Sequence, residues 1–301
     1  MPEHDSATWS VGERDVRVSN LGKLVWPGDG LTKGDLLDYL RAIAPTMLPH
    51  LAGRPLTLRV YPDDINGRSF YQRDLPDDAP AWLSRAAYTP AETGRTIHVP
   101  LADEAADLVW LANRGCLELH AWSSREPDLA EPDQAVFDLD PGDETPFEQV
   151  LAVGLRLRGV LNGLGLRACA KTSGRSGLHV HVPLAPGHRF DAVRAWVKAV
   201  ALELAAAAPD VVTEARGATH RGRLVAVDYA QNSIARSMAA AYGVRAVAGA
   251  PVSAPLAWDE VAAGRVRPAD FTLRTMPERV EAVGDLFAPM LRHDQRLPVD
   301  R

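Results

Sequence analysis

Two aspartates interrupt a stretch that otherwise has the composition of a buried β-strand. The stretch is VFDLDPGD, residues 136–143, and it contains Asp138 and Asp140. Because side chains alternate between the two faces of a strand, Phe137 and Leu139 point to one face and both carboxylates point to the other. Two neighbouring like charges favour a shared proton or a bound cation, and all-oxygen ligation suits Mg²⁺ or Mn²⁺. The alternative is that the two aspartates cap the turn that begins at PGD.

A third carboxylate, Asp228, ends the apolar run in RLVAVDYAQN, residues 223–232. Taken alone, it would be a turn residue at the end of a strand. Three carboxylates on strands, however, are typical of two-metal phosphoryl or nucleotidyl transfer, in which cations about 3.5–4 Å apart hold a triphosphate and stabilise the leaving pyrophosphate. The sequence therefore predicts a two-metal site at Asp138, Asp140 and Asp228.

A glycine turn between two predicted strands lies in KTSGRSGLHVHVPL, residues 171–184. Ser173, Gly174 and Gly177 give a tight turn whose backbone N–H groups can face an anion, helped by the Ser173 hydroxyl and by Lys171. Phosphate is the ligand that such a turn suits. A lone glycine turn of this kind is a weak signal, so its weight comes from the carboxylates nearby in the predicted fold.

Two histidines follow the glycine turn on the outgoing strand. Leu178, Val180 and Val182 take the core face, which leaves His179 and His181 together on the other face. The pair is expected at the phosphate site, at a separate metal site, or on the surface as two solvated side chains.

Haloacid-dehalogenase phosphatases also place Asp-x-Asp after a hydrophobic strand, with the first Asp as nucleophile. Their pattern has Gly-Thr or a similar pair after the second Asp and an acidic pair downstream. Here Pro141 and Gly142 follow Asp140, and no Asp-Asp pair occurs after residue 142. A phosphatase of this class is therefore disfavoured.

Composition indicates an ordinary globular protein. The chain has 301 residues, of which 46% are hydrophobic and 24% charged, with a formal net charge of −6. That charge argues against broad electrostatic binding of nucleic acid, but its distribution is uneven. Residues 149–190 contain no acid and several Lys and Arg, and a second basic cluster, RGATHRGR, spans 216–223 and includes Arg221. Each cluster is either a solvated face or a local anion-binding surface.

No membrane or secretory segment is expected. The stretch MPEHDSATWSVGERD lacks an apolar h-region, and AWVKAVALELAAAAP is interrupted by Lys198 and Glu203. Cys116 and Cys169 stand apart without CxxC spacing, which favours buried free thiols in a reducing cytoplasm.

The elements that must position these residues follow an α/β pattern. Thr32 and Asp35 resemble a capping box at the start of a helix whose apolar stripe is Leu36, Leu37, Leu40 and Ile43. The predicted strands are 55–61, 96–100, 116–122, 134–140, 166–172, 178–184 and 224–230, and the other predicted helices are 103–115, 146–163 and 191–208. We expect a single catalytic unit over 1–301 with two lobes, at about 15–125 and about 126–301.

In order and spacing, FDLDP, KTSGRSGLHVHVPL and VDYAQN resemble the polymerase domain of bacterial DNA ligase D, a member of the archaeo-eukaryotic primase superfamily. The resemblance runs from VSNLGKLVWP to LRHDQRLP, nearly the whole chain. It implies an α/β primase-like catalytic core with an RRM-like sheet, packed against an N-terminal α/β lobe.

The resemblance also implies roles for individual residues. The family's two catalytic metals, Mn²⁺ or Mg²⁺, fall on Asp138, Asp140 and Asp228. The incoming NTP or dNTP is expected at His120, Ser173, Gly174, His179 and Arg245, to which the glycine-turn argument adds Lys171. The DNA-binding residues are expected to be Asn20, Lys23 and Lys33 at a 5′-phosphate and Phe70 and Tyr71 stacked on the template, to which the basic cluster at 216–223 adds Arg221. Val247-Ala248 and Tyr71 depart from the family's Arg-Pro and second Phe.

The activity that the resemblance implies is addition of nucleotides, preferentially ribonucleotides with manganese, to 3′-hydroxyls at gaps and double-strand ends during non-homologous end joining. The expected partners are a DNA ligase and Ku, and the expected location is the bacterial nucleoid in the cytoplasm. Nick sealing needs Lys-x-Asp-Gly, and the nearest match, KGDL at 33–36, has the wrong order. The alternatives are a primase that starts strands without a primer and a non-catalytic module that bridges DNA ends.

Overall fold

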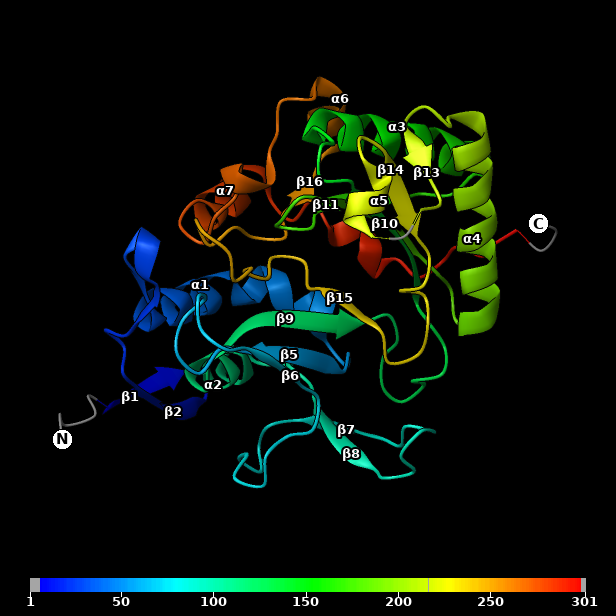
Figure 1. Cartoon of the computed structure of the whole chain (residues 1–301). Helices are drawn as coiled ribbons and strands as arrows, with labels where there is room; N and C mark the ends of the chain where they lie inside the picture. The colour runs from blue at the N-terminus through cyan, green and yellow to red at the C-terminus, as the bar shows by residue number, and fades with distance from the viewer. Residues whose placement is uncertain (1–5, 216, 299–301) are drawn as a thin grey trace.

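Two β-sheets organise the computed structural model, which describes residues 6–215 and 217–298 (Figure 1). The larger sheet has six strands in the order β13 (Val212–Thr213), β14 (Val225–Asp228), β10 (Gln134–Pro141), β12 (Leu178–Pro183), β11 (Cys169–Thr172) and β16 (Pro255–Leu256). The smaller sheet has four, in the order β15 (Ser237–Ala239), β9 (Cys116–Trp122), β5 (Leu56–Val60) and β6 (Phe70–Gln72).

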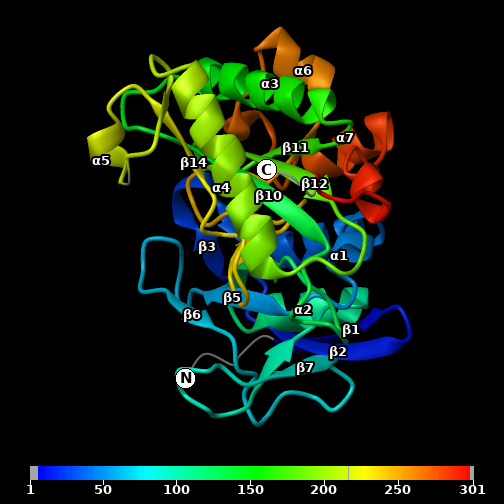
Figure 2. The same ribbon diagram turned by 90° about the vertical axis from the view of Figure 1, so that its right-hand side faces the viewer.

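One face of the six-stranded sheet is covered by two long helices, α3 (Phe147–Gly163) and α4 (Phe190–Ala207) (Figure 2). Phe137 and Leu139 on β10 are fully buried on this face, and the Phe137 ring packs edge-on against Trp196 of α4. The expected alternation is therefore confirmed, and it directs Asp138 and Asp140 to the opposite face.

The N-terminal part is built around α1 (Lys33–Leu51), which packs against α2 (Ala105–Asn113). The predicted capping box is present: the Asp35 N–H donates to Thr32 Oγ1 at 3.1 Å, and the Thr32 N–H donates to Asp35 Oδ2 at 2.7 Å. The predicted apolar stripe is buried, which confirms the helix and its register. The remaining strands here are β1 (Ser6–Val11), β2 (Arg14–Ser19), β3 (Leu24–Trp26), β4 (Leu31–Thr32), β7 (Arg85–Tyr88) and β8 (Ile97–Pro100).

The chain passes between the two sheets more than once. Strand β15 belongs to the C-terminal half, yet it pairs with β9, placing Ala239 opposite His120. The division into lobes near residue 125 therefore stays a prediction, with β15 as a segment that crosses it. The remaining helical segments are α5 (Ala218–Arg221), α6 (Trp258–Ala263), α7 (Met276–Val283) and the 3₁₀ turns η1 (Pro27–Asp29), η2 (Pro268–Asp270) and η3 (Ala288–Leu291).

Two predicted strands are shorter than expected because side chains take over backbone hydrogen bonds. Strand β11 begins at Cys169 instead of 166, and the Gln295 side chain pairs with both the N–H and the C=O of Arg167. Strand β14 ends at Asp228 instead of 230, where Asp228 Oδ1 accepts from the Ala230 N–H at 2.7 Å. A local side-chain acceptor of this kind competes with the strand ladder.

Both cysteines are buried free thiols, as predicted. Within the described ranges, no helix is long and apolar enough to cross a membrane.

Asn232 replaces the missing strand partner of β10 beyond the end of β14. Its Oδ1 accepts from the Val136 N–H at 2.8 Å and its Nδ2 donates to the Val136 C=O at 2.7 Å. Asn232 is 1% exposed, so a substitution would strand two buried backbone groups.

We expect Asn232→Ala to lower the free energy of unfolding by about 2 kcal/mol or more, because each unpaired buried group costs on the order of 1–3 kcal/mol. Urea denaturation followed by circular dichroism measures this. Asn162→Ala, at an exposed position on α3, is the control and should change stability little. A similar, small effect for both variants would contradict the role of Asn232.

Candidate functional site

A row of four charged or titratable side chains crosses four neighbouring strands of the six-stranded sheet. Asp138 lies opposite Asp228 on β14 and opposite His179 on β12, and His179 lies opposite Lys171 on β11. Directly opposed residues point to the same face of a sheet. The row therefore occupies the face away from α3 and α4, and Asp140, two residues after Asp138, shares it.

The negative charges of the carboxylates on this face repel one another. Burial and the charge of Asp228 raise the pKa of Asp138 to about 7. Burial and the charge of Asp138 raise the pKa of Asp140 to about 7, and the Arg221 guanidinium, 3.5 Å from Asp140 Oδ2, opposes that rise. Burial and mutual repulsion therefore disfavour the state in which both carboxylates are ionised.

Oxygen donors with uncompensated negative charge fit Mg²⁺ or Mn²⁺. The three predicted ligands are not equally oriented, because the Asp228 carboxylate accepts from Ala230 N and from Gln231 Nε2 at 3.5 Å. Within the described part of the chain, no three His, Cys, Asp or Glu side chains are gathered closely enough to form a ready-made metal cluster. Metal binding by Asp138, Asp140 and Asp228 thus stays a prediction.

Lys171 is buried behind His179, which corrects its expected role at the phosphate. Its Nζ lies 2.7 Å from His179 Nδ1 and donates to Ser253 Oγ at 2.7 Å and to Ala239 O at 2.8 Å. Burial lowers the pKa values of Lys171 and His179 well below their ordinary ranges. A protonated Lys171 uses all three donors here, and it leaves the proton of neutral His179 on Nε2, 3.3 Å from Asp138 Oδ1.

The predicted glycine turn is closed by its own serine. Ser173 Oγ accepts from the Gly177 N–H at 2.9 Å and the Arg175 N–H at 3.2 Å. Both lone pairs of the hydroxyl are therefore used, and its O–H remains available to donate to a ligand. Gly174 has φ +71°, and a Cβ there would lie 2.5 Å from Arg245 Cγ, so this position requires glycine.

Asp138, Asp140 and the glycine turn share one cavity of about 270 Å³, whereas Asp228 lines a separate cavity of about 250 Å³. The 270 Å³ cavity is lined by Tyr71, His120, Asp138, Asp140, Ser173, Arg175, Ser176, His179, Gln231, Ser237, Met238, Ala239 and Arg245. Of the six predicted nucleotide-binding residues, four therefore line it directly, and Gly174 supports it beneath Arg245. Through Tyr71, His120, Gln231 and Ser237 it continues into a cleft of about 930 Å³.

Arg175 and Gln231 line the cavity although we assigned them no role from the sequence. Both stand inside the motifs that carry the resemblance, KTSGRSGLHVHVPL and VDYAQN. Glu118, two residues before His120, was also missed, and the period-two alternation of its strand was the available signal. Of the long acid-free stretch, Arg156 and Arg158 lie on α3, away from the cavity, so this stretch does not form one anion-binding surface.

Lys23 and Lys33 lie side by side across the β3–β4 hairpin. The Lys33 N–H donates to Lys23 O at 2.8 Å, and burial together with the nearby Lys23 charge lowers the pKa of Lys33 to about 8. Asn20 begins the turn that leads to them, with its C=O accepting from the Lys23 N–H at 3.0 Å. Two adjacent cations suit a doubly charged anion.

The other predicted DNA contacts are arranged differently than expected. Phe70 and Tyr71 are successive residues of β6, so they face opposite sides; Tyr71 lines the 270 Å³ cavity, while Phe70 lines an apolar pocket of about 200 Å³. They therefore do not form one stacking platform. Arg221 pairs with Asp140 and donates to Ala215 O instead of extending from a basic surface. Arg216, in the same basic cluster, lies outside the described residues.

Comparisons with known proteins agree with this geometry. A family model described as the primase-polymerase domain of LigD matches residues 32–287. The chain is 33% identical over 277 residues to the multifunctional non-homologous end joining protein LigD of Mycolicibacterium smegmatis, covering 91% of this chain and 36% of that protein. Over 275 residues it is 33% identical to LigD of Pseudomonas aeruginosa, with coverage of 90% and 32%. It thus spans about a third of the length of these curated relatives.

The fold is similar to that of the polymerase domain from Mycobacterium tuberculosis ligase D in complex with DNA. The TM-score is 0.86 at 32% sequence identity, with 93% of this chain and 99% of that chain covered. This similarity confirms the predicted α/β, primase-like fold class.

We expect Asp138→Asn to stabilise the protein in the presence of a chelator at pH 8. Because the folded pKa of Asp138 is raised, the carboxyl favours folding only while protonated, and this contribution is lost as pH rises from about 4 through about 7. The variant should gain about 2 kcal/mol or more at pH 8 and little at pH 4.5. Urea denaturation at both pH values measures the difference. Asp143→Asn, at an exposed position, is the control, and a pH-independent gain at Asp138 would refute the argument.

Proposed function

Because the chain belongs to the family of LigD primase-polymerase domains, as its motifs predicted, we propose that it is a metal-dependent nucleotidyltransferase acting on DNA ends. It adds nucleotides to 3′-hydroxyls at gaps and double-strand breaks. The related proteins are named for non-homologous end joining, and the similar structure is a complex with DNA, which supports DNA as the partner. A DNA ligase and Ku are the further partners we propose, with the bacterial nucleoid as the location.

The observation that carries this proposal is the division of one cavity into an acidic and a basic wall. Asp138 and Asp140 form the acidic wall, and Arg175 and Arg245 belong to the basic wall. Mg²⁺ or Mn²⁺ held by Asp138, Asp140 and Asp228 would activate the attacking 3′-hydroxyl and stabilise the leaving pyrophosphate. The basic wall would hold the triphosphate by charge-assisted hydrogen bonds.

His179 and Ser173 complete the triphosphate side. With its proton on Nε2, His179 presents a donor between Asp138 and the cavity, and the Ser173 O–H is a second donor. Both donors are fixed from behind, by Lys171 and by the turn itself. Preorganised donors of this kind bind an anion without reorganising.

His120 supports a preference for ribonucleotides. Its Nε2 lies 3.0 Å from the buried Glu118 carboxylate, and burial lowers its pKa, so the neutral ring donates to Glu118 through Nε2. Nδ1 is then an acceptor on a residue that lines the cavity. An acceptor suits a sugar hydroxyl and would repel a phosphate oxygen, so we propose that His120 contacts the ribose.

The central test is primer extension on gapped DNA with Mn²⁺ or Mg²⁺ and with ribo- or deoxyribonucleotides. We expect extension that requires a divalent cation, is faster with ribonucleotides, and falls at least about 100-fold in Asp138→Ala and Asp140→Ala. Asp143→Ala, an exposed acid three residues after Asp140, is the matched control and should retain activity. Near wild-type extension by either active-site variant would show that the acidic row is not the catalytic site.

A second test concerns the paired lysines. We expect gapped DNA with a 5′-phosphate to bind several-fold better than gapped DNA with a 5′-hydroxyl at pH 7, where Lys33 is protonated. The preference should fade at high salt and above pH 8. Titration of fluorescent duplexes measures it. Replacing Lys23 and Lys33 with alanine should remove the preference, while the control pair Arg156→Ala and Lys198→Ala, both exposed, removes the same charge elsewhere.

Equal affinity of the wild type for the two duplexes would contradict gap recognition. It would favour a primase that starts strands without a primer, because such an enzyme has no use for a downstream 5′-phosphate.

A further inference from the structure

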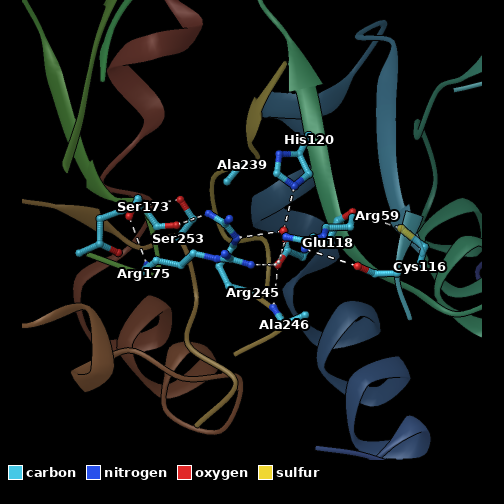
Figure 3. Close-up of polar contacts among 12 residues, drawn as sticks. Arg59, Cys116, Glu118, His120, Ser173, Arg175, Ala239, Arg245, Ala246 and Ser253 are labelled. Carbon is cyan, nitrogen blue, oxygen red and sulfur yellow. Dashed lines mark hydrogen bonds and ion pairs between the residues drawn. The ribbon is translucent and has the colours of Figure 1, made fainter. Parts of the chain in front are cut away.

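Glu118 is a fully buried carboxylate that lies between the two sheets. It belongs to β9 of the four-stranded sheet, and its side chain points toward Arg175 of the glycine turn and toward Arg245 (Figure 3). A buried charge persists only when it is paired and hydrogen-bonded. The partners of Glu118 therefore indicate what it is for.

Both oxygens of this carboxylate accept hydrogen bonds. Oε1 accepts from Arg175 Nη2 at 2.9 Å and from the Ala246 N–H at 3.0 Å, while Oε2 lies 3.0 Å from His120 Nε2 and 3.3 Å from Arg245 Nε. An ionised carboxylate offers about four lone-pair sites. Hydrogen bonds fill three of these sites, while Arg245 Nε is an ion-pair partner without hydrogen-bond geometry. Because the side chain is also fully buried, Glu118 is not placed to contact a substrate or a metal ion itself.

Positive charge exceeds negative charge around Glu118. Arg59 Nη1, 3.9 Å from Oε1, is the third guanidinium near it, so three cations against one anion leave two positive charges. Burial would raise the pKa of Glu118, but the His120 hydrogen bond and the Arg245 charge outweigh it and hold that pKa below its usual range. The carboxylate therefore stays ionised at neutral pH.

Three of the groups that contact Glu118 also line the 270 Å³ cavity: Arg175, Arg245 and His120. We infer that Glu118 is the positioning residue of the nucleotide pocket, which holds these three side chains in their binding orientations before a nucleotide arrives. This inference rests on the proposed function, because it assigns the cavity to a nucleotide triphosphate.

Without Glu118, the cations would no longer share an anion and would repel one another. Burial and the charge of Arg175 lower the pKa of Arg245, and the Arg175 side chain is 38% exposed, so it is free to turn toward solvent. Arg245 would keep only its hydrogen bond from Nη1 to Ser173 O. The nucleotide would then have to order both guanidinium groups on binding, which weakens affinity.

The test is Glu118→Gln, which keeps the shape and removes the charge. We expect the KM for nucleotide and the dissociation constant of ATP to rise about tenfold or more, while kcat on saturating nucleotide changes by less than about threefold. The dissociation constant of AMP should rise much less, because AMP lacks the phosphates that the guanidinium groups hold. Equilibrium titration with ATP and AMP, together with steady-state extension kinetics, measures these quantities.

Asp133→Asn is the matched control for lost stability. Asp133 is a half-buried carboxylate that holds two guanidinium groups, with Arg54 at 2.6 Å and Arg125 at 2.8 Å, but it does not line the cavity. This variant should lose thermal stability yet keep both nucleotide affinities within about twofold. Equal losses of ATP and AMP affinity in Glu118→Gln, or unchanged ATP affinity, would overturn the inference.

If Glu118→Gln does not fold, Glu118→Asp is the variant that tests the positioning role. The aspartate keeps the negative charge, but its side chain is shorter by one methylene, so its carboxylate lies farther from the guanidinium groups. The KM for nucleotide should therefore rise by a smaller factor than in Glu118→Gln. An unchanged KM would overturn the inference. The wild type separates this outcome from failure of the proposed function. A wild-type protein that neither binds ATP nor extends primers would refute the function itself.

Discussion

The mutual repulsion of carboxylates on one sheet face is the constraint on which the rest of this structure depends. The pairing register places Asp138 directly opposite Asp228, and strand alternation adds Asp140 to the same face. A one-residue change in the register of β10 cannot separate the carboxylates, because it would move Phe137 and Leu139 out of the core under α3 and α4. Packing of the apolar face of β10 thus determines which side chains lie on the opposite face. Positive charge near the carboxylates must then come from other strands and loops.

That positive charge comes from segments distant in the sequence. Arg221 approaches Asp140 from the side, and Lys171, whose pKa burial lowers well below its ordinary range, stands behind His179 at the end of the row. These two side chains do not offset burial and repulsion, since the pKa values of Asp138 and Asp140 remain raised to about 7. Across the cavity the imbalance is reversed, because the guanidinium groups around Glu118 outnumber their one carboxylate. Two opposite excesses of charge therefore face the same 270 Å³ space.

Local rules were enough to predict the long helices and the central strands, but not the short strands or the long-range side-chain partners. Strand alternation placed Asp138 and Asp140, and the spacing of Thr32 and Asp35 placed a helix start, because both depend on neighbours within a few residues. The burial of Lys171 depends on its pairing with Ser253, 82 residues away, and β11 is shortened by a side chain 128 residues after Arg167. Contacts between residues so far apart in the sequence produce no pattern in the local sequence from which they could be predicted.

The two opposed excesses of charge also bear on the order of binding under the proposed function. A divalent cation alone would relieve the acidic wall but not the guanidinium groups, and a free triphosphate would do the reverse while facing the repulsion of Asp138 and Asp140. A cation–triphosphate complex satisfies both walls at once. Because Glu118 is fully buried and held by three hydrogen bonds, it cannot swing in to replace the triphosphate, so the basic wall stays uncompensated until substrate binds. Under the proposed function, each wall would favour one component and leave the other wall uncompensated, so the cavity would suit the nucleotide together with its cation.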